Sequence, residues 1–205
     1  MLQFTPTPVG LTRTQLSSFL ERELVPALEE ASRGSGFVRA LVRLLERVPE
    51  KLYEPVTEIA TPSTFKSRFG RLFGLGEIST EPFVEQAYRR LLGKRGVALY
   101  RRGELEPFLI GLNPSTMRVT TPLHEMFHYF FREETLSPSI YRILERELPQ
   151  ARQYQLTVDD ILSELASVYI ANPRSKVLDY IRKLPSSWKG VLADVLERIG
   201  VRPRW

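Results

Sequence analysis

The two histidines of this 205-residue chain lie four positions apart, at His124 and His128, and Glu125 directly follows the first of them. Imidazole nitrogens are common zinc ligands, and residues four apart on a helix project from the same face, so one metal ion can reach both rings. Two histidines placed at random would show this spacing with an adjacent glutamate in roughly 1 chain in 1000. The pattern therefore predicts a zinc site, and two satisfied core histidines are the less favoured alternative.

A catalytic zinc normally has three protein ligands and one open position. Because the chain has no cysteine and no third histidine, the third ligand must be a carboxylate. Glu164 is favoured, since it lies at the edge of the apolar face of a helix expected over Val158 to Ala171. Glu147, on the preceding helical segment, is the alternative. Asp160, one turn before Glu164, is expected to accept a hydrogen bond from a ligating imidazole.

The elements that must position these residues are mainly helical. Apolar periodicity and breaks at proline and glycine predict helices over 14–32 (with a kink or break at Pro26), 37–48, 63–73, 80–92, 122–134, 139–148, 158–171, 175–183 and 186–199. The segments Val97–Arg101 and Pro107–Leu112 flank a short polar link and predict the one convincing β-hairpin. The expected fold class is therefore α+β, mainly α with a small β-hairpin or sheet. Because the composition changes near Gly96, we expect a helical N-terminal region over 1–95 and a second domain over 96–205 that carries the metal site.

The charge of the chain does not single out a partner. The formal net charge is +5, but 29 basic and 24 acidic residues are interspersed, so solubility explains the charge at least as well as nucleic-acid binding does. No segment approaches the roughly 20 apolar residues of a membrane span, and the N-terminus lacks the pattern of a signal peptide. We expect a cytoplasmic protein without a membrane partner.

The segment His124–His128, followed by Glu164 on a later helix, resembles the gluzincin group of zinc metallopeptidases. Ser163–Ser167, with small residues after the glutamate, is similar to the group's third-ligand helix, and Phe108–Leu112 is similar to the strand at the rim of its cleft. The resemblance covers about residues 96–172. It implies a zincin-like catalytic domain, Zn²⁺ as cofactor, and a peptide or protein substrate.

The resemblance also implies a mechanism. Zinc lowers the pKa of a bound water and polarises the scissile carbonyl, while Glu125 accepts the water's proton and passes it to the leaving amine. No further histidine remains to stabilise the oxyanion, so the candidates are arginines and these tyrosines: Tyr129, Tyr141, Tyr154 and Tyr169.

Other interpretations of the chain stay open. Residues 64–92 and the hairpin also fit a winged helix-turn-helix, with Gly74–Gly76 as the turn, coupled to a peptidase that cleaves a repressor. In that case four basic residues would contact phosphates: Arg89, Arg90, Lys94 and Arg95. Ordinary solvated helix faces are the favoured explanation.

If residues 1–95 do not bind DNA, they are expected to form a lid, a pro-segment or a partner-binding region. A non-catalytic, zinc-stabilised scaffold is a further alternative, although Glu125 argues against it, because structural zinc needs no general base.

Overall fold

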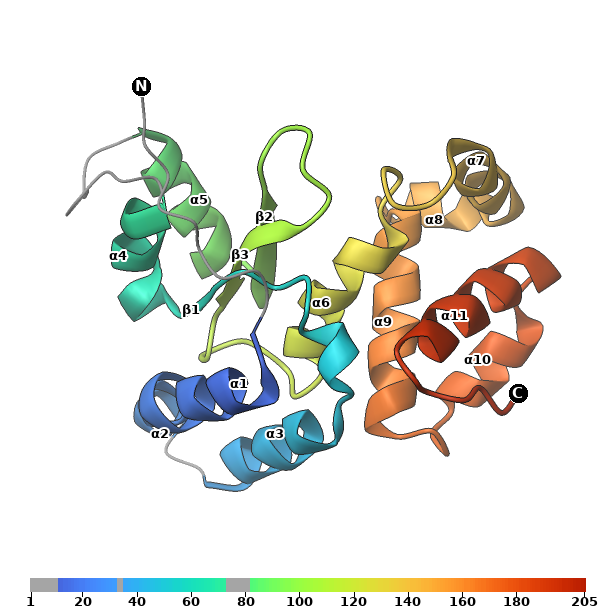
Figure 1. Cartoon of the computed structure of the whole chain (residues 1–205). Coiled ribbons are helices and arrows are strands. Elements are labelled where there is room, and N and C mark those ends of the chain that lie inside the picture. The colour runs from blue at the N-terminus through green and yellow to red at the C-terminus, as the bar shows by residue number, and fades with distance from the viewer. Residues whose placement is uncertain (1–10, 33–34, 73–81) are drawn as a thin grey trace. The chain divides into compact units, whose positions relative to one another are not determined.

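The computed structural model describes residues 11–32, 35–72 and 82–205, and this part of the chain is mainly helical with a small three-stranded sheet (Figure 1). The predicted α+β class is thereby confirmed. The chain divides into two compact units, Met1–Pro122 and Leu123–Trp205, called the first and second unit below. Within the described ranges, no helix is long and apolar enough to cross a membrane.

The sheet of the first unit has the strand order β1-β3-β2. The hairpin strands β2 (Gly96–Tyr100) and β3 (Pro107–Leu112) pair antiparallel, as predicted, and every residue of the central strand β3 is buried. Strand β1 (Ile59–Ala60) pairs with β3 in parallel, with Ile59 opposite Ile110. The sequence pattern predicted the hairpin as the one β element, and it missed this third strand. A strand of two residues is too short to show an alternation of apolar and polar side chains. It forms because β3 offers a free edge with which it can pair.

Helices α4 (Pro62–Leu72) and α5 (Pro82–Leu92) pack on this sheet and on each other. Both helices were predicted, and the predicted positions 73, 80 and 81 lie outside the described residues. Their apolar faces form a core cluster with the strands; its buried members are Ala60, Phe65, Phe69, Val84, Leu91, Phe108 and Leu109. This packing places the hairpin in the first unit. The border between the compact units therefore lies after Pro122, not near Gly96, where the sequence suggested a domain border.

The first unit also contains a continuous helix in three parts, α1 (Arg13–Phe19), the π-helical η1 (Leu20–Leu24) and α2 (Val25–Ser32). The Val25 amide donates to the Leu20 carbonyl, five residues back. Pro26 has no amide hydrogen and cannot continue the α-helical ladder, which accounts for a change of helix type immediately before it. The break predicted at Pro26 thus takes the form of a π-helical segment.

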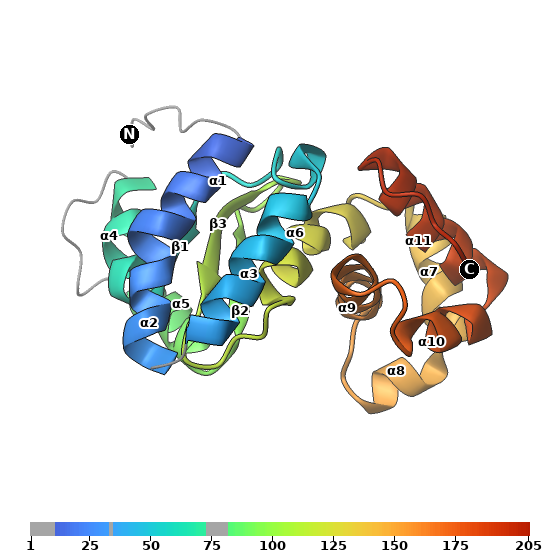
Figure 2. The same ribbon diagram turned by 90° about the horizontal axis from the view of Figure 1, so that it is seen from below.

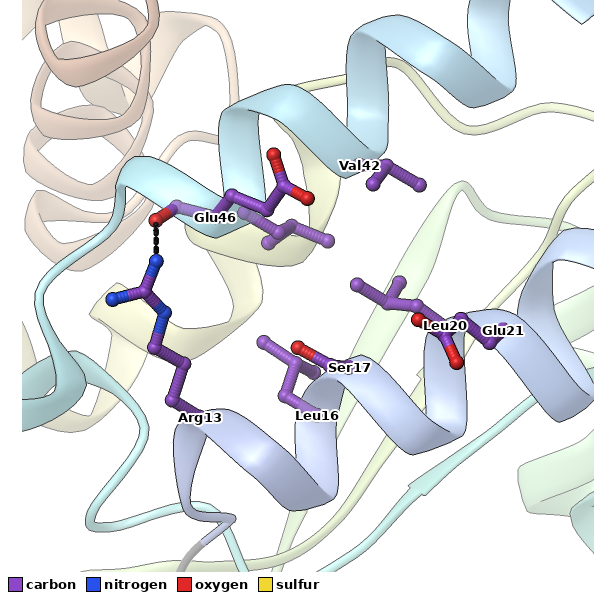
Figure 3. Close-up of a pocket in the computed structure, with 8 residues that line it drawn as sticks. Arg13, Leu16, Ser17, Leu20, Glu21, Val42 and Glu46 are labelled. Atoms are coloured by element: carbon purple, nitrogen blue, oxygen red, sulfur yellow. Dashed lines mark hydrogen bonds between the residues drawn. The ribbon is translucent and has the colours of Figure 1, made fainter.

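Helix α3 (Ser35–Arg47) lies beside this continuous helix (Figure 2) and is followed by the 3₁₀ turn η2 (Glu50–Leu52). A cavity of about 30 Å³ lies between α3 and the continuous helix, lined by apolar side chains such as Leu16, Leu20 and Val42 and by polar ones such as Ser17 and Glu21 (Figure 3). Arg13 closes one end by donating from Nη2 to the Glu46 carbonyl over 3.0 Å. A space of this size holds about one water molecule, so we assign it no ligand.

The second unit consists of six helices in its described residues. They are α6 (Thr121–Phe131, which begins at the unit border), α7 (Pro138–Glu147), α8 (Pro149–Gln153), α9 (Val158–Ala171), α10 (Val177–Lys183) and α11 (Ser186–Arg198). Helix α9 packs against α7, α10 and α11, and the indole of the fully buried Trp188 donates to the Leu144 carbonyl over 3.1 Å. The predicted bounds of α9 match those observed. Helix α8 was not predicted, and α6 ends three residues earlier than predicted.

Candidate metal centre

Helix α6 places its two histidines and Glu125 together. Several of its apolar residues, among them Leu123, Met126 and Phe127, are fully buried, and this fixes the rotation of the helix. The imidazole rings of His124 and His128 lie one turn apart, with centroids separated by 4.7 Å and ring planes at 84°. Glu125 is 7% exposed, and its Oε2 lies 4.0 Å from His128 Nε2. The structure thus brings together the three residues that the sequence motif predicted.

The other side of the site is the first turn of α9. Thr157 is the N-cap residue, and its hydroxyl accepts a hydrogen bond from the Asp160 amide while the Asp160 carboxylate accepts one from the Thr157 amide. This reciprocal arrangement is a capping box, which specifies where the helix begins. It places Asp159 and Asp160 in the first helical turn, where the helix dipole favours negative charge.

His128 lies between these two aspartates. Its Nδ1 is 3.0 Å from Asp159 Oδ2, and its Nε2 is 3.7 Å from Asp160 Oδ1. When Nδ1 donates to Asp159, the lone pair of the ring lies on Nε2, the atom that faces Asp160. Metal-ligating histidines commonly have such a carboxylate partner on the nitrogen that does not bind the metal.

The charges around His128 also shift its protonation. Burial lowers the pKa of His128, but the hydrogen bond to Asp159 and the charges of Glu125, Asp159 and Asp160 outweigh burial and raise it above its ordinary value. Conversely, burial raises the pKa of Asp159, and its hydrogen bonds to His128 and Thr157 more than offset this effect and lower it. An ionised Asp159 therefore faces His128 at neutral pH.

Glu164, the favoured third ligand of the sequence prediction, lies beside the other histidine. Its Oε2 is 3.2 Å from His124 Nδ1, and its side chain is 47% exposed. The donor atoms that lie within 4.8 Å of one another come instead from His124, His128 and Asp160. Asp160, which the sequence suggested as a hydrogen-bond partner of a ligand, thus joins the two histidines in this group of potential donors.

Glu147, the alternative third ligand, is not brought to the histidines. It is the last residue of α7, it is exposed, and it accepts a hydrogen bond from the Ser187 hydroxyl of α11. Glu147 therefore contributes to the packing of α7 against α11.

Among the tyrosines considered for the oxyanion, Tyr141 interacts with the cluster. Burial, followed by the charges of Asp159, Glu145 and Glu133, raises the pKa of Tyr141 to about 12, so its hydroxyl keeps its proton at neutral pH. By contrast, Tyr154 is 73% exposed, and the Tyr169 hydroxyl donates to the Arg202 carbonyl. Tyr141 is therefore linked to the cluster through the charge of Asp159.

The donor set has the chemistry of a zinc site. Two imidazoles and one carboxylate are a common ligand combination in catalytic zinc centres, which leave one position open. Two ligand atoms at about 2.1 Å from a tetrahedral zinc lie about 3.4 Å apart. The 3.7 Å between His128 Nε2 and Asp160 Oδ1 is close to this distance. All three donor atoms lie within 4.8 Å of one another, so these residues could hold a zinc ion.

Comparison of the chain with protein-family models, with curated proteins and with solved structures found no match.

Proposed function

We propose that this chain is a zinc-dependent metallopeptidase whose active site lies between α6 and the first turn of α9. The observation that supports this best is the position of Glu125, a nearly buried carboxylate next to the converging donors of His124, His128 and Asp160. A carboxylate in this position would lie beside a water held by the metal, where it could act as the general base.

In this proposal the chain's own residues have distinct tasks. Bound zinc would supply a water of lowered pKa and an electrophile for the scissile carbonyl. Glu125 accepts the proton of the attacking water and delivers it to the leaving amine. Asp159 and Glu164 orient the rings of His128 and His124 through their Nδ1 atoms, at 3.0 and 3.2 Å. The protonated Tyr141 hydroxyl is the candidate donor to the developing oxyanion.

We further propose Asp160 as the third ligand and Glu164 as an orienting residue. Zinc affinity, measured by competition with a chelating dye, tests this assignment in three variants. Asp160→Ala should lose stoichiometric zinc, Glu164→Ala should bind about tenfold more weakly, and Glu147→Ala should bind like the wild type. Loss of zinc in Glu164→Ala together with normal binding by Asp160→Ala would restore the ligand set predicted from the sequence.

The catalytic role is tested with Glu125→Gln. The variant should bind zinc like the wild type but cleave casein at least about 100-fold more slowly, because the general base is removed while the ligands remain. Glu147→Gln is the matched control and should keep full activity. Absence of zinc from wild-type protein purified without chelator would exclude the proposed function. Zinc binding without cleavage of any peptide substrate would favour the zinc-stabilised scaffold.

The DNA-associated alternative gains no specific support. On α5, Arg89 pairs with Glu85 over 3.2 Å, and Lys66 of α4 pairs with the same carboxylate over 2.9 Å, so part of the positive charge is already compensated. The alternative remains a prediction that salt-dependent binding to duplex DNA would test. The role of residues 1–95 as a lid, pro-segment or partner-binding region likewise remains a prediction.

A further inference from the structure

We propose that Thr157 is a positioning residue of the metal centre, and that the capping box of α9 fixes the carboxylates on both sides of His128. This inference depends on the proposed function for its metal. Its geometry, however, belongs to the chain alone and can be tested without a metal.

The hydroxyl of Thr157 contacts both aspartates. Its Oγ1 lies 2.8 Å from Asp160 Oδ2 and is also hydrogen-bonded to Asp159 Oδ1. A hydroxyl has one hydrogen, so it donates to one carboxylate at a time or is shared between them, while its lone pairs accept from the Asp160 amide at 3.3 Å. One side chain thus fixes two adjacent carboxylates that would otherwise repel each other.

Each aspartate uses its second oxygen at His128. Asp159 bonds to Thr157 through Oδ1 and faces His128 Nδ1 through Oδ2. Asp160 bonds to Thr157 through Oδ2 and faces His128 Nε2 through Oδ1. Both series of contacts start at the Thr157 hydroxyl, and they end at the two ring nitrogens of His128. Removal of the hydroxyl should therefore loosen the proposed ligand and the orienting carboxylate together.

The chain contains a capping box that lacks these additional contacts. At the start of α1, the Thr12 hydroxyl accepts from the Gln15 amide over 3.2 Å, and the Thr12 amide donates to Gln15 Oε1 over 2.8 Å. The reciprocal hydrogen bonds of this capping box are the same as those at Thr157, but the residue at the third helical position is a glutamine, whose side chain is uncharged. Thr12 is consequently a matched control for the loss of a cap as such.

The experiment compares Thr157→Gly, Thr157→Ser and Thr12→Gly with the wild type. Glycine is an acceptable N-cap residue, so Thr157→Gly should fold, and serine keeps the hydroxyl. We measure zinc affinity by competition and the visible absorption of the Co²⁺-substituted protein. Thr157→Gly should bind about tenfold more weakly with an altered Co²⁺ spectrum, whereas Thr157→Ser and Thr12→Gly should resemble the wild type. Wild-type affinity and spectrum in Thr157→Gly would overturn the inference.

A second readout separates this inference from the proposed function. In the metal-free protein, the ¹⁵N shifts of the His128 ring report which nitrogen carries the proton. They should differ from the wild type in Thr157→Gly and not in Thr12→Gly. If the wild type binds no metal, the proposed function fails, and these shifts alone decide the positioning role. Unchanged ring shifts in Thr157→Gly would then exclude it.

Discussion

Carboxylates in this chain differ in what surrounds them, and Glu58 shows the cost of burial most directly. It precedes β1 and pairs with Arg68, whose guanidinium also pairs with Glu23. Burial raises the pKa of Glu58 above its ordinary value, although Arg68 and Arg71 act in the opposite direction. Asp159 is different because a histidine and a threonine hydroxyl both bind its charged form.

A pH-dependent stability follows for the first unit. Since the pKa of Glu58 is higher in the folded than in the unfolded chain, the folded state loses relative stability as the pH rises through the interval between these two values. Glu58→Gln removes this loss. The variant should therefore gain stability relative to the wild type between about pH 4 and about pH 7. Urea unfolding at both pH values measures this, with the exposed Glu30→Gln as the control. An equal difference between Glu58→Gln and wild type at both values would contradict it.

At the scale of elements, the close packing of α5 on the sheet leaves little space for a side chain at Gly111. A Cβ atom at Gly111 of β3 would lie 3.1 Å from the Leu91 side chain and 3.1 Å from Cγ1 of Val97. Gly111→Val should cost about 1–3 kcal/mol of unfolding free energy because it overpacks this contact. Thermal or urea unfolding provides the measurement.

Gly190 provides the opposite case for comparison. It lies in α11, and a Cβ atom there would meet no neighbour within 4 Å. Gly190→Ala should be neutral or stabilise the protein by up to about 1 kcal/mol, since alanine favours the helix. If both substitutions destabilised the protein equally, the packing explanation for Gly111 would be wrong.

The elements that the sequence predicted well are those whose signal is local. The helix α9 has a capping box and a long apolar periodicity, and its bounds were predicted correctly. The end of α6 was predicted incorrectly, because hydrogen bonds of the following turn compete with those of the helix. The Thr135 hydroxyl donates to the Tyr129 carbonyl, and the Thr135 and Leu136 amides donate to the Arg132 carbonyl. These bonds satisfy acceptors near the helix end although the apolar pattern suggested a longer helix.

The same distinction applies to the candidate site. The spacing of His124 and His128 within one helix was sufficient to predict that their rings meet. The choice between Asp160 and Glu164 depends on how α9 is rotated and shifted against α6, and the two carboxylates differ by one helical turn. The apolar pattern of a single helix does not indicate how that helix is rotated or shifted against another one. The sequence therefore did not decide the third ligand.

At the scale of the whole molecule, every proposed metal donor lies within Leu123–Trp205. Zinc should therefore slow amide hydrogen exchange in α6 and α9, and leave the hairpin of β2 and β3 unchanged. At a free zinc concentration 100 times the dissociation constant, the stabilisation is about 2.7 kcal/mol, or about 100-fold in exchange rate. Peptide-resolved exchange with and without zinc measures this. Equal slowing of exchange by zinc in both units would contradict the assignment. In Asp160→Ala, zinc should not slow the exchange.

The parallel pairing of β1 with β3 has a consequence for the order in which the chain folds. The hairpin of β2 and β3 closes a short link, whereas the Thr57 hydroxyl meets the Pro107 carbonyl across 50 positions of sequence. Closing a long segment costs more chain entropy, and the cost falls once α4 and α5 have shortened the path between the ends. We therefore expect β1 to join last, to a hairpin already covered by its helices. The shortest strand of the sheet would then complete the first unit.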